Sequence, residues 1–220
     1  MQTWLSWSSG KDSAWSLEML RRGGEHEVTG LFTTVNAQFD RVAMHAVRRT
    51  LLEAQAEAVG VALHAIDIPY PCPNADYERI MGAFVAKAQA HGVAAMAFGD
   101  LFLADIRAYR ERQLAGTGIA PLFPLWGRDT RMLAAEMIDS ELVAHLTCVD
   151  PRKLDREFAG RRFDQAFLAD LPDGIDPCGE NGEFHTFVSA GPMFHEAVPI
   201  RTGDVVERDG FVFADLVPVG

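Results

Sequence analysis

The chain has 220 residues and a mass of 24.2 kDa, which suits one medium-sized domain with or without a small additional lobe. Hydrophobic residues make up 48% of it and charged residues 23%, a balance that excludes disordered and fibrous proteins. The 20 basic and 31 acidic residues give a formal net charge of −11, which disfavours binding to nucleic acid or to an anionic membrane surface.

The chain also lacks the signals of a membrane or secreted protein. It has no apolar run of the roughly 18 residues needed to span a bilayer, and no basic flank followed by an apolar stretch at its N-terminus. Cys72, Cys148 and Cys178 are odd in number and widely spaced, which suits a reducing compartment. We therefore expect a cytoplasmic protein without membrane association, and a homodimer remains open.

Strands and helices alternate along the first two thirds of the chain. Apolar runs predict strands at residues 3–7, 28–35, 61–68, 93–98 and 142–149. Apolar residues at helical spacing predict helices at residues 14–20, 44–58, 77–90, 103–114 and 130–139. This alternation predicts an α/β fold with a doubly wound, parallel five-stranded sheet. Ligands of such sheets bind at the carboxyl ends of the strands.

The pattern changes beyond Asp150. A helix is predicted from Leu154 to Leu168, followed by a Gly-, Pro- and acid-rich segment at 170–183. Short strands at 184–188 and 196–200 and a hairpin at Asp209-Gly210 complete the chain. We interpret residues 1–150 as a nucleotide-binding domain and residues 151–220 as a smaller α+β lobe that binds the substrate.

The segment Ser8-Ser9-Gly10-Lys11-Asp12-Ser13 lies between the first strand and the first helix. Backbone N–H groups at a helix N-terminus attract anions, and Lys11 adds a movable positive charge. A Walker P-loop is excluded, because Leu5 stands where that motif needs glycine and Asp12 stands where it needs Ser or Thr. On its own, the segment also fits an ordinary helix cap.

This hexapeptide resembles S-G-G-x-D-S, the pyrophosphate loop of the N-type ATP pyrophosphatases, which cleave ATP between its α and β phosphates. Ser9 departs from that pattern. If the backbone has a positive φ at this position, serine costs about 1 kcal/mol relative to glycine.

Further segments resemble the ordered motifs of the diphthine–ammonia ligase (diphthamide synthase) family, over nearly the whole chain. They are Phe98-Gly99-Asp100, Arg107 with Tyr109-Arg110-Glu111, Pro124-Leu125-Trp126, and Cys178 to Thr186. The last motif usually reads G-E-G-G-E-F, and Asn181 departs from it. Asparagine tolerates a left-handed backbone, so the expected turn is retained.

The resemblance implies an adenine nucleotide alpha hydrolase-like fold and an ATP-dependent amide-forming ligase. ATP would adenylate a substrate carboxylate, pyrophosphate would leave, and ammonia would attack the acyl-adenylate to give a carboxamide and AMP. The implied cofactors are ATP and Mg²⁺. The acceptor is a carboxylate-bearing substrate, and a protein such as an elongation factor is one candidate.

The resemblance and the predicted topology together assign the site residues. As catalytic residues, Lys11 would neutralise the leaving pyrophosphate, and Asp12 and Asp100 would hold Mg²⁺ directly or through water. The residues expected to bind ATP are Ser8, Ser9, Gly10, Lys11, Asp12, Ser13, Phe32, Thr33 and Gly99, with the adenine near residues 32–34. The residues expected to bind the substrate are Arg107, Tyr109, Arg110, Trp126, Glu180, Glu183 and His185.

Two other functions stay open. A tRNA-thiolating or lysidine-type enzyme would use the same pyrophosphate loop, although the net charge disfavours an RNA substrate. A nucleotide-binding sensor would bind ATP or AMP without turnover. Cys178 beside Gly179 suits a packing role better than a nucleophile, because no paired base is apparent.

Overall fold

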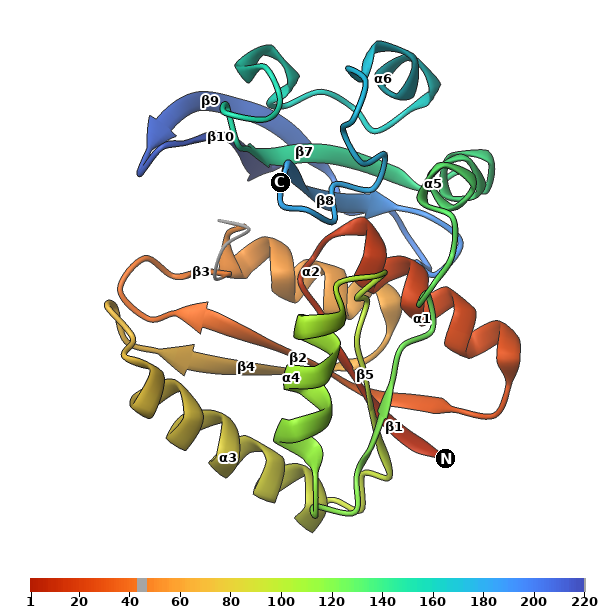
Figure 1. The fold of residues 1–220 in the computed structure, drawn as a ribbon, viewed down its shortest axis with the longest axis vertical. Helices are drawn as coiled ribbons and strands as arrows, with labels where there is room; N and C mark the ends of the chain where they lie inside the picture. Colours follow the sequence, from red (N-terminus) through yellow and green to blue (C-terminus); the bar gives the residue numbers. More distant parts are fainter. Residues whose placement is uncertain (43–46, 220) are drawn as a thin grey trace.

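The first of two sheets contains five parallel strands in the order β4–β2–β1–β5–β6 (Figure 1). The computed structural model describes residues 1–42 and 47–219. The five strands are β1 (Gln2–Ser6), β2 (Glu27–Asn36), β4 (Ala62–Ile68), β5 (Ala95–Ala97) and β6 (Ala120–Leu122). The two-residue strand β3 (Arg41–Val42) pairs antiparallel with the end of β2.

Helices cover both faces of this sheet, which confirms the doubly wound α/β prediction (Figure 1). α3 (Asn74–Ala90) and α4 (Ala104–Leu114) lie on one face, where Phe84 packs with Trp4 and Phe32 of the strands. α1 (Lys11–Gly23) and α2 (Arg49–Val59) lie on the other face. α1 ends where Gly24 takes a left-handed conformation with φ of 71°.

The second sheet is antiparallel, in the order β8–β7–β10–β9. Its strands are β7 (Val143–Val149), β8 (Phe184–Ala190), β9 (Ile200–Arg208) and β10 (Phe211–Pro218). The sheet lies across α1 and α2, so these two helices form a layer between the sheets (Figure 1). Leu17 of α1, Leu52 of α2 and Phe187 of β8 belong to one buried cluster.

The parallel sheet has the predicted number of strands, but its fifth strand is not the predicted one. Residues 142–149 contain β7, which pairs with β8 and β10 in the second sheet. The fifth parallel strand is β6, which lies in the Pro-rich corner and has only three residues. The division of the chain at residue 150 stays a prediction.

Two predicted elements of the C-terminal part are wrong. The helix predicted from Leu154 to Leu168 is replaced by a 3-10 turn (Arg156–Phe158) and the short α6 (Gln165–Asp170). Gly160, with φ of 83°, interrupts the predicted helix. The Asp164 side chain caps the N-terminus of α6. The strand predicted at 196–200 begins only at Ile200.

Other predicted elements are confirmed. α5 (Thr130–Asp139) has the predicted bounds, and the Asp129 side chain caps it by accepting the Met132 N–H. The hairpin between β9 and β10 turns at Asp209 and Gly210, which have φ of 53° and 80°. The predicted start of the second helix at Met44 lies outside the described residues. No helix in the described parts of the chain combines the length and apolar character required to cross a bilayer.

Candidate active site

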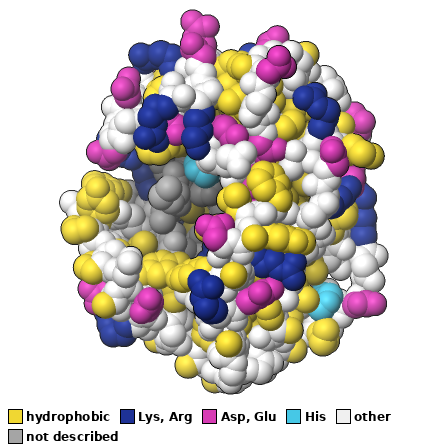
Figure 2. All heavy atoms as spheres, in the orientation of Figure 1, with side chains coloured by type: hydrophobic (Ala, Val, Ile, Leu, Met, Phe, Trp, Pro, Cys, Tyr) yellow, Lys and Arg dark blue, Asp and Glu magenta, His cyan; other side chains and the backbone are white. Residues whose placement is uncertain are grey.

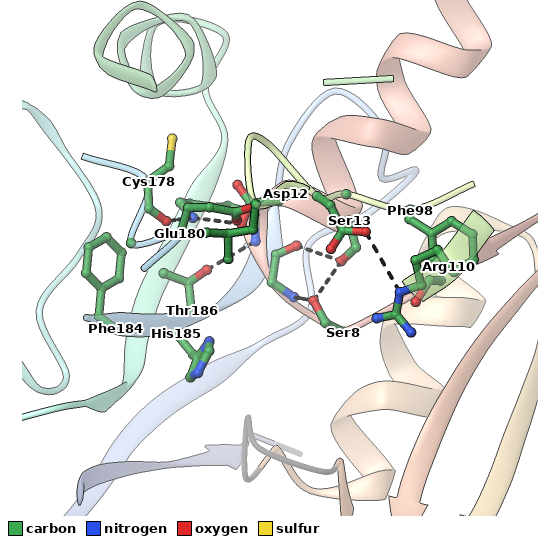
Figure 3. A pocket seen from close by; sticks show the side chains of 17 residues that line it. Ser8, Asp12, Ser13, Phe98, Arg110, Cys178, Glu180, Phe184, His185 and Thr186 are labelled. Atoms are coloured by element: carbon green, nitrogen blue, oxygen red, sulfur yellow. Dashed lines mark hydrogen bonds and ion pairs between the residues drawn. The ribbon is translucent and has the colours of Figure 1, made fainter. Parts of the chain in front are cut away.

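A cavity of about 260 Å³ lies where the carboxyl ends of β1 and β5 meet the N-terminus of α1 and the segment before β8 (Figure 3). This is the sheet edge at which the topology predicts a ligand. Figure 2 shows the surface hollowed between the part that carries the second sheet and the part that carries the first. The cavity is lined by ten predicted site residues: Ser8, Gly10, Lys11, Asp12, Ser13, Gly99, Asp100, Arg110, Glu180 and His185.

The predicted pyrophosphate loop runs from β1 into α1. Ser9 is buried and takes a φ of +71°, the left-handed conformation for which glycine would be preferred. Gly10 is the N-cap of α1, and its N–H donates to Ser8 Oγ at 3.3 Å. The Lys11 N–H donates to Thr186 Oγ1 of β8 at 3.1 Å. Both hydroxyl groups hold positions at a helix N-terminus that phosphate oxygens are suited to take.

Gly99 allows the segment after β5 to approach α1 closely. A Cβ atom at this position would lie 3.0 Å from the Asp12 carbonyl carbon and 3.1 Å from the Ser13 nitrogen. The absence of a side chain therefore brings Asp100, the next residue, to the first turn of α1. This contact unites the two predicted metal-binding carboxylates in one cavity.

Lys11 is held in place, in contrast to the movable charge expected from the sequence. Its side chain is 3% exposed, and its ammonium group lies 2.9 Å from Asp12 Oδ2 and donates to the Cys178 carbonyl. Burial alone would lower the pKa of Lys11, but the neighbouring acidic groups, Asp12 foremost, raise it above its ordinary value. The Lys11 side chain is therefore a fixed cation at the floor of the cavity.

Two carboxylate oxygens in the cavity fit a divalent cation. Asp12 Oδ1 and Asp100 Oδ2 are buried and have no hydrogen-bond partner among the described residues. Arg110 Nε lies 3.9 Å from Asp100 Oδ2, and burial raises the pKa of Asp100. The described residues contain no cluster of three or more metal-binding side chains. Mg²⁺ commonly takes one or two carboxylates and completes its shell with phosphate oxygens and water, so the pair suits Mg²⁺ carried by a nucleotide.

Glu180 lines the same cavity as the two aspartates and lies close to Asp12 (Figure 3). Its Oε1 accepts the Leu101 N–H at 2.7 Å, which links the segment before β8 to the segment after β5. Burial and the nearby charges of Asp12 and Asp100 raise the pKa of Glu180 to about 7, although the Leu101 N–H opposes this shift. Glu180 therefore exchanges a proton near neutral pH.

Glu183 has a different position from Glu180, although both were expected to bind substrate. It is 3% exposed and is not among the described residues that line the cavity. Its Oε1 accepts the Asp176 N–H and an Asn181 amide hydrogen, both at 3.2 Å. Glu183 thus organises the turn that carries Glu180. In this turn Gly179 and Gly182 take positive φ, whereas Asn181 does not need the left-handed backbone considered above.

His185 lies at the boundary between the cavity and a second one of about 300 Å³, which Phe39 and Tyr70 help to line. Burial, assisted by the charge of Lys11, lowers the pKa of His185 to about 4. The imidazole is therefore neutral at physiological pH.

Seven predicted site residues are not among the described residues of the cavity lining: Ser9, Phe32, Thr33, Arg107, Tyr109, Trp126 and Glu183. Phe32 packs in the core against Phe84 and Phe98. The Arg107 guanidinium stacks 4.8 Å from the ring centroids of Trp126 and of Phe123. The Tyr109 hydroxyl accepts a hydrogen bond from Gln113 at 2.7 Å.

The structure adds residues that were not assigned to the site from the sequence. Thr186 supports the pyrophosphate loop through the Lys11 N–H, and the Cys178 carbonyl holds the Lys11 ammonium. Both belong to the motif at Cys178 to Thr186, which is the signal that marks them. The Cys178 thiol is 1% exposed and donates to the Thr130 carbonyl at 3.3 Å, and burial raises its pKa. These features favour a packing role for the thiol.

Comparison with known protein families finds two domains of one family along the chain. Residues 1–119 match the diphthamide synthase N-terminal domain, and residues 129–212 match the diphthamide synthase C-terminal domain. The chain belongs to the diphthamide synthase family. The family assignment confirms the resemblance that the motifs indicated.

Individual members of the diphthamide synthase family are similar to the chain over most of their length. The diphthine–ammonia ligases of Bos taurus and Homo sapiens are each 25% identical to it, over 94% of this chain and 85% of theirs. The diphthine–ammonia ligase of Danio rerio is 26% identical, over 97% of this chain and 90% of its own. These similarities support the predicted ATP-dependent ligase function and do not favour the tRNA-modifying or sensor alternatives.

Proposed function

We propose that the chain uses ATP to adenylate a carboxylate and then transfers ammonia to it, forming a carboxamide and AMP. The observation that carries this proposal is the convergence in one cavity of the pyrophosphate loop, Lys11 and the carboxylates of Asp12, Asp100 and Glu180. Adenylation needs stabilisation of the charge that develops on the leaving pyrophosphate rather than a covalent nucleophile. A fixed cation and amide donors at a helix N-terminus are suited to that task.

In this proposal, the β and γ phosphates of ATP lie on Ser8, Gly10 and Ser13, with Lys11 beneath them. Asp12 and Asp100 hold Mg²⁺, which when bound neutralises phosphate charge and favours departure of pyrophosphate. Arg110, whose side chain is one quarter exposed in the cavity wall, is available for a phosphate oxygen. Phe32 and Thr33, in the middle of β2, remain the residues near which we expect the adenine.

Glu180 is suited to the second half of the reaction. At physiological pH most ammonia is present as ammonium, which must lose a proton before its nitrogen can attack the acyl-adenylate. A carboxylate with a pKa of about 7 accepts that proton at the pH where the reaction is needed. Neutral His185, in the lining of the same cavity, adds a hydrogen-bonding group without adding charge.

The names of the relatives suggest the acceptor of the ammonia. The relatives are named for diphthine and ammonia, so we propose a diphthine-like carboxylate, presented by a protein such as an elongation factor. On the face shown in Figure 2, basic and acidic side chains are interspersed, which supports a protein acceptor over an RNA. Arg107, Tyr109 and Trp126 keep their proposed role around the acceptor rather than at the phosphates, whereas Glu183 acts indirectly, through the turn that carries Glu180. A cytoplasmic location and a homodimer also remain predictions.

The test is release of AMP and pyrophosphate from ATP in the presence of Mg²⁺, ammonium and the acceptor protein. Lys11→Met and Asp12→Asn should each lower the rate by about 10²-fold or more, because each removes a charge that the leaving group or its metal needs. Lys87→Met, on the exposed face of α3, is the matched control and should leave the rate unchanged. Formation of ADP instead of AMP, or full activity of either site variant, would refute the proposed chemistry.

A further inference from the structure

Gln55 is a fully buried polar residue on α2, outside the cavity lining described above. Its side-chain carbonyl accepts the indole N–H of Trp7 at 2.9 Å. Its amide group donates to the Ser9 carbonyl at 3.1 Å and to the Val188 carbonyl at 2.6 Å. One side chain thus connects the segment after β1, the pyrophosphate loop and β8 of the second sheet.

The bond to Ser9 reaches the most strained point of the loop. Ser9 carries a side chain yet takes a φ of +71°, a conformation that L-residues adopt only when their surroundings impose it. Its carbonyl accepts two hydrogen bonds, from Gln55 and from the Val188 N–H at 2.9 Å. Because the peptide unit is planar, fixing this carbonyl also fixes the direction of the Gly10 N–H, which lies in the cavity wall.

We infer that Gln55 is a positioning residue for phosphate binding, which acts by holding the Ser9–Gly10 peptide in the orientation that presents the Gly10 N–H to the nucleotide. This inference rests on the proposed function, which identifies ATP as the ligand of the pyrophosphate loop. Gln55 does not contact the nucleotide in this scheme, and its effect passes through the backbone of Ser9.

This role differs from that of a glutamine that only fills the core. A core-filling residue would contribute equally whatever stands at position 9. A residue that holds serine in a left-handed conformation becomes less important when glycine replaces the serine, because glycine adopts that conformation without steric cost. The effect of changing Gln55 should therefore depend on whether serine or glycine stands at position 9 only if Gln55 is a positioning residue.

The experiment compares Gln55→Met in the natural chain and in a chain that carries Ser9→Gly. Affinity for α,β-methylene ATP with Mg²⁺ is measured by isothermal titration calorimetry, and folding is checked by thermal unfolding. We expect Gln55→Met to weaken binding about tenfold in the natural chain and less than about threefold with Ser9→Gly, in line with the loss of the neutral hydrogen bond to the Ser9 carbonyl. Wild-type affinity of Gln55→Met, or the same loss in both backgrounds, would overturn the inference.

Two further variants separate loop positioning from stability. Trp7→Phe removes the indole donor to Gln55 but keeps both bonds that the amide donates, so it should lower the unfolding temperature and change affinity less than about twofold. Gln55→Leu also removes both amide donors without burying a charge, and replaces Gln55→Met if that variant does not fold. An affinity loss in Trp7→Phe as large as that in Gln55→Met would count against a specific role for the amide.

Hydrogen exchange in the ligand-free protein decides the inference even if the proposed function fails. The Gly10 and Lys11 amides should exchange faster in Gln55→Met than in the natural chain, and this acceleration should shrink in the Ser9→Gly background. If the natural chain does not bind the ATP analogue, the proposed function fails. Unchanged exchange at these two amides would instead refute the role of Gln55.

Discussion

The carboxyl group of Glu180 gives the cavity a pH dependence of its own. Its pKa is about 7 in the folded chain and 4.5 for an ordinary glutamate, so between these values the folded state binds more protons than the unfolded state. The free energy of unfolding contributed by this group therefore falls as pH rises from about 4.5 to 7 and is level above that range.

Glu180→Gln should remove this dependence. We expect the variant to gain stability relative to the natural chain as pH rises from 5 to 8, as measured by urea unfolding at each pH. Asp173→Asn, at an exposed position of the same acidic segment, is the control for the change in net charge. A difference between Glu180→Gln and the natural chain that does not vary with pH would contradict the prediction. Glu180→Gln should also retain ATP binding and lose carboxamide formation.

At the scale of elements, the contact between the segment after β5 and α1 depends on Gly99. Gly99→Ala places a methyl group about 3.0 Å from the Asp12 backbone, so the first turn of α1 must shift and the Asp12 and Asp100 carboxylates must separate. We expect lower stability, by about 1–3 kcal/mol, and weaker binding of MgATP. Thermal unfolding and titration calorimetry measure the two effects.

Gly82→Ala is the matched control for this substitution. Gly82 lies within α3, and a Cβ at this position would meet no atom within 4 Å. Alanine should therefore stabilise the helix by up to about 1 kcal/mol and leave nucleotide affinity unchanged. If Gly99→Ala behaved like Gly82→Ala, the close contact with α1 would not matter for the site.

The sequence predicted the elements whose periodicity is strong and local. It identified the alternation of β1, α1, β2 and the later helices, because apolar spacing and glycine stops are visible in each segment. It missed β6, since three residues in a Pro-rich corner carry no periodic signal. It also placed residues 142–149 in the wrong sheet, because a buried strand such as β7 has the same apolar run in either sheet.

The candidate site was predictable to the extent that motifs marked it. The pyrophosphate loop, Asp100 and Glu180 all lie in such motifs and all line the cavity. The sequence predicted the same substrate-binding role for Glu180 and Glu183. The turn between them instead buries Glu183 and exposes Glu180 to the cavity. Gln55 was not predicted, since its partners lie 46 and 133 residues away in the chain.

At the scale of the whole molecule, the layer formed by α1 and α2 is shared by both sheets (Figure 1). The main buried cluster contains Leu5 of β1, Leu17 of α1 and Leu146 of β7, so removal of either sheet would expose apolar faces of these helices. The Val188 N–H also donates to the Ser9 carbonyl, which joins β8 to the pyrophosphate loop. The two sheets should therefore unfold together.

Two probes test this cooperativity. The tryptophans lie within the first 126 residues, so their fluorescence reports on the first sheet and its helices. Hydrogen exchange of β7 and β8 reports on the second sheet. We expect the midpoints of urea unfolding from the two probes to coincide, and ATP analogues to raise both. Separate midpoints would indicate two independent folding units.

The position of Lys11 makes it an internal reporter for chemical labelling. The chain contains three lysines, and Lys87 and Lys153 are exposed, whereas Lys11 is buried with its ammonium group bound to Asp12 and Cys178. Acylating reagents require a free, unprotonated amine at the surface, so the closed molecule should be modified at Lys87, Lys153 and the N-terminus. Acylation of Lys11 then marks each opening of the cavity floor, and peptide mapping can follow that opening without any introduced dye or mutation.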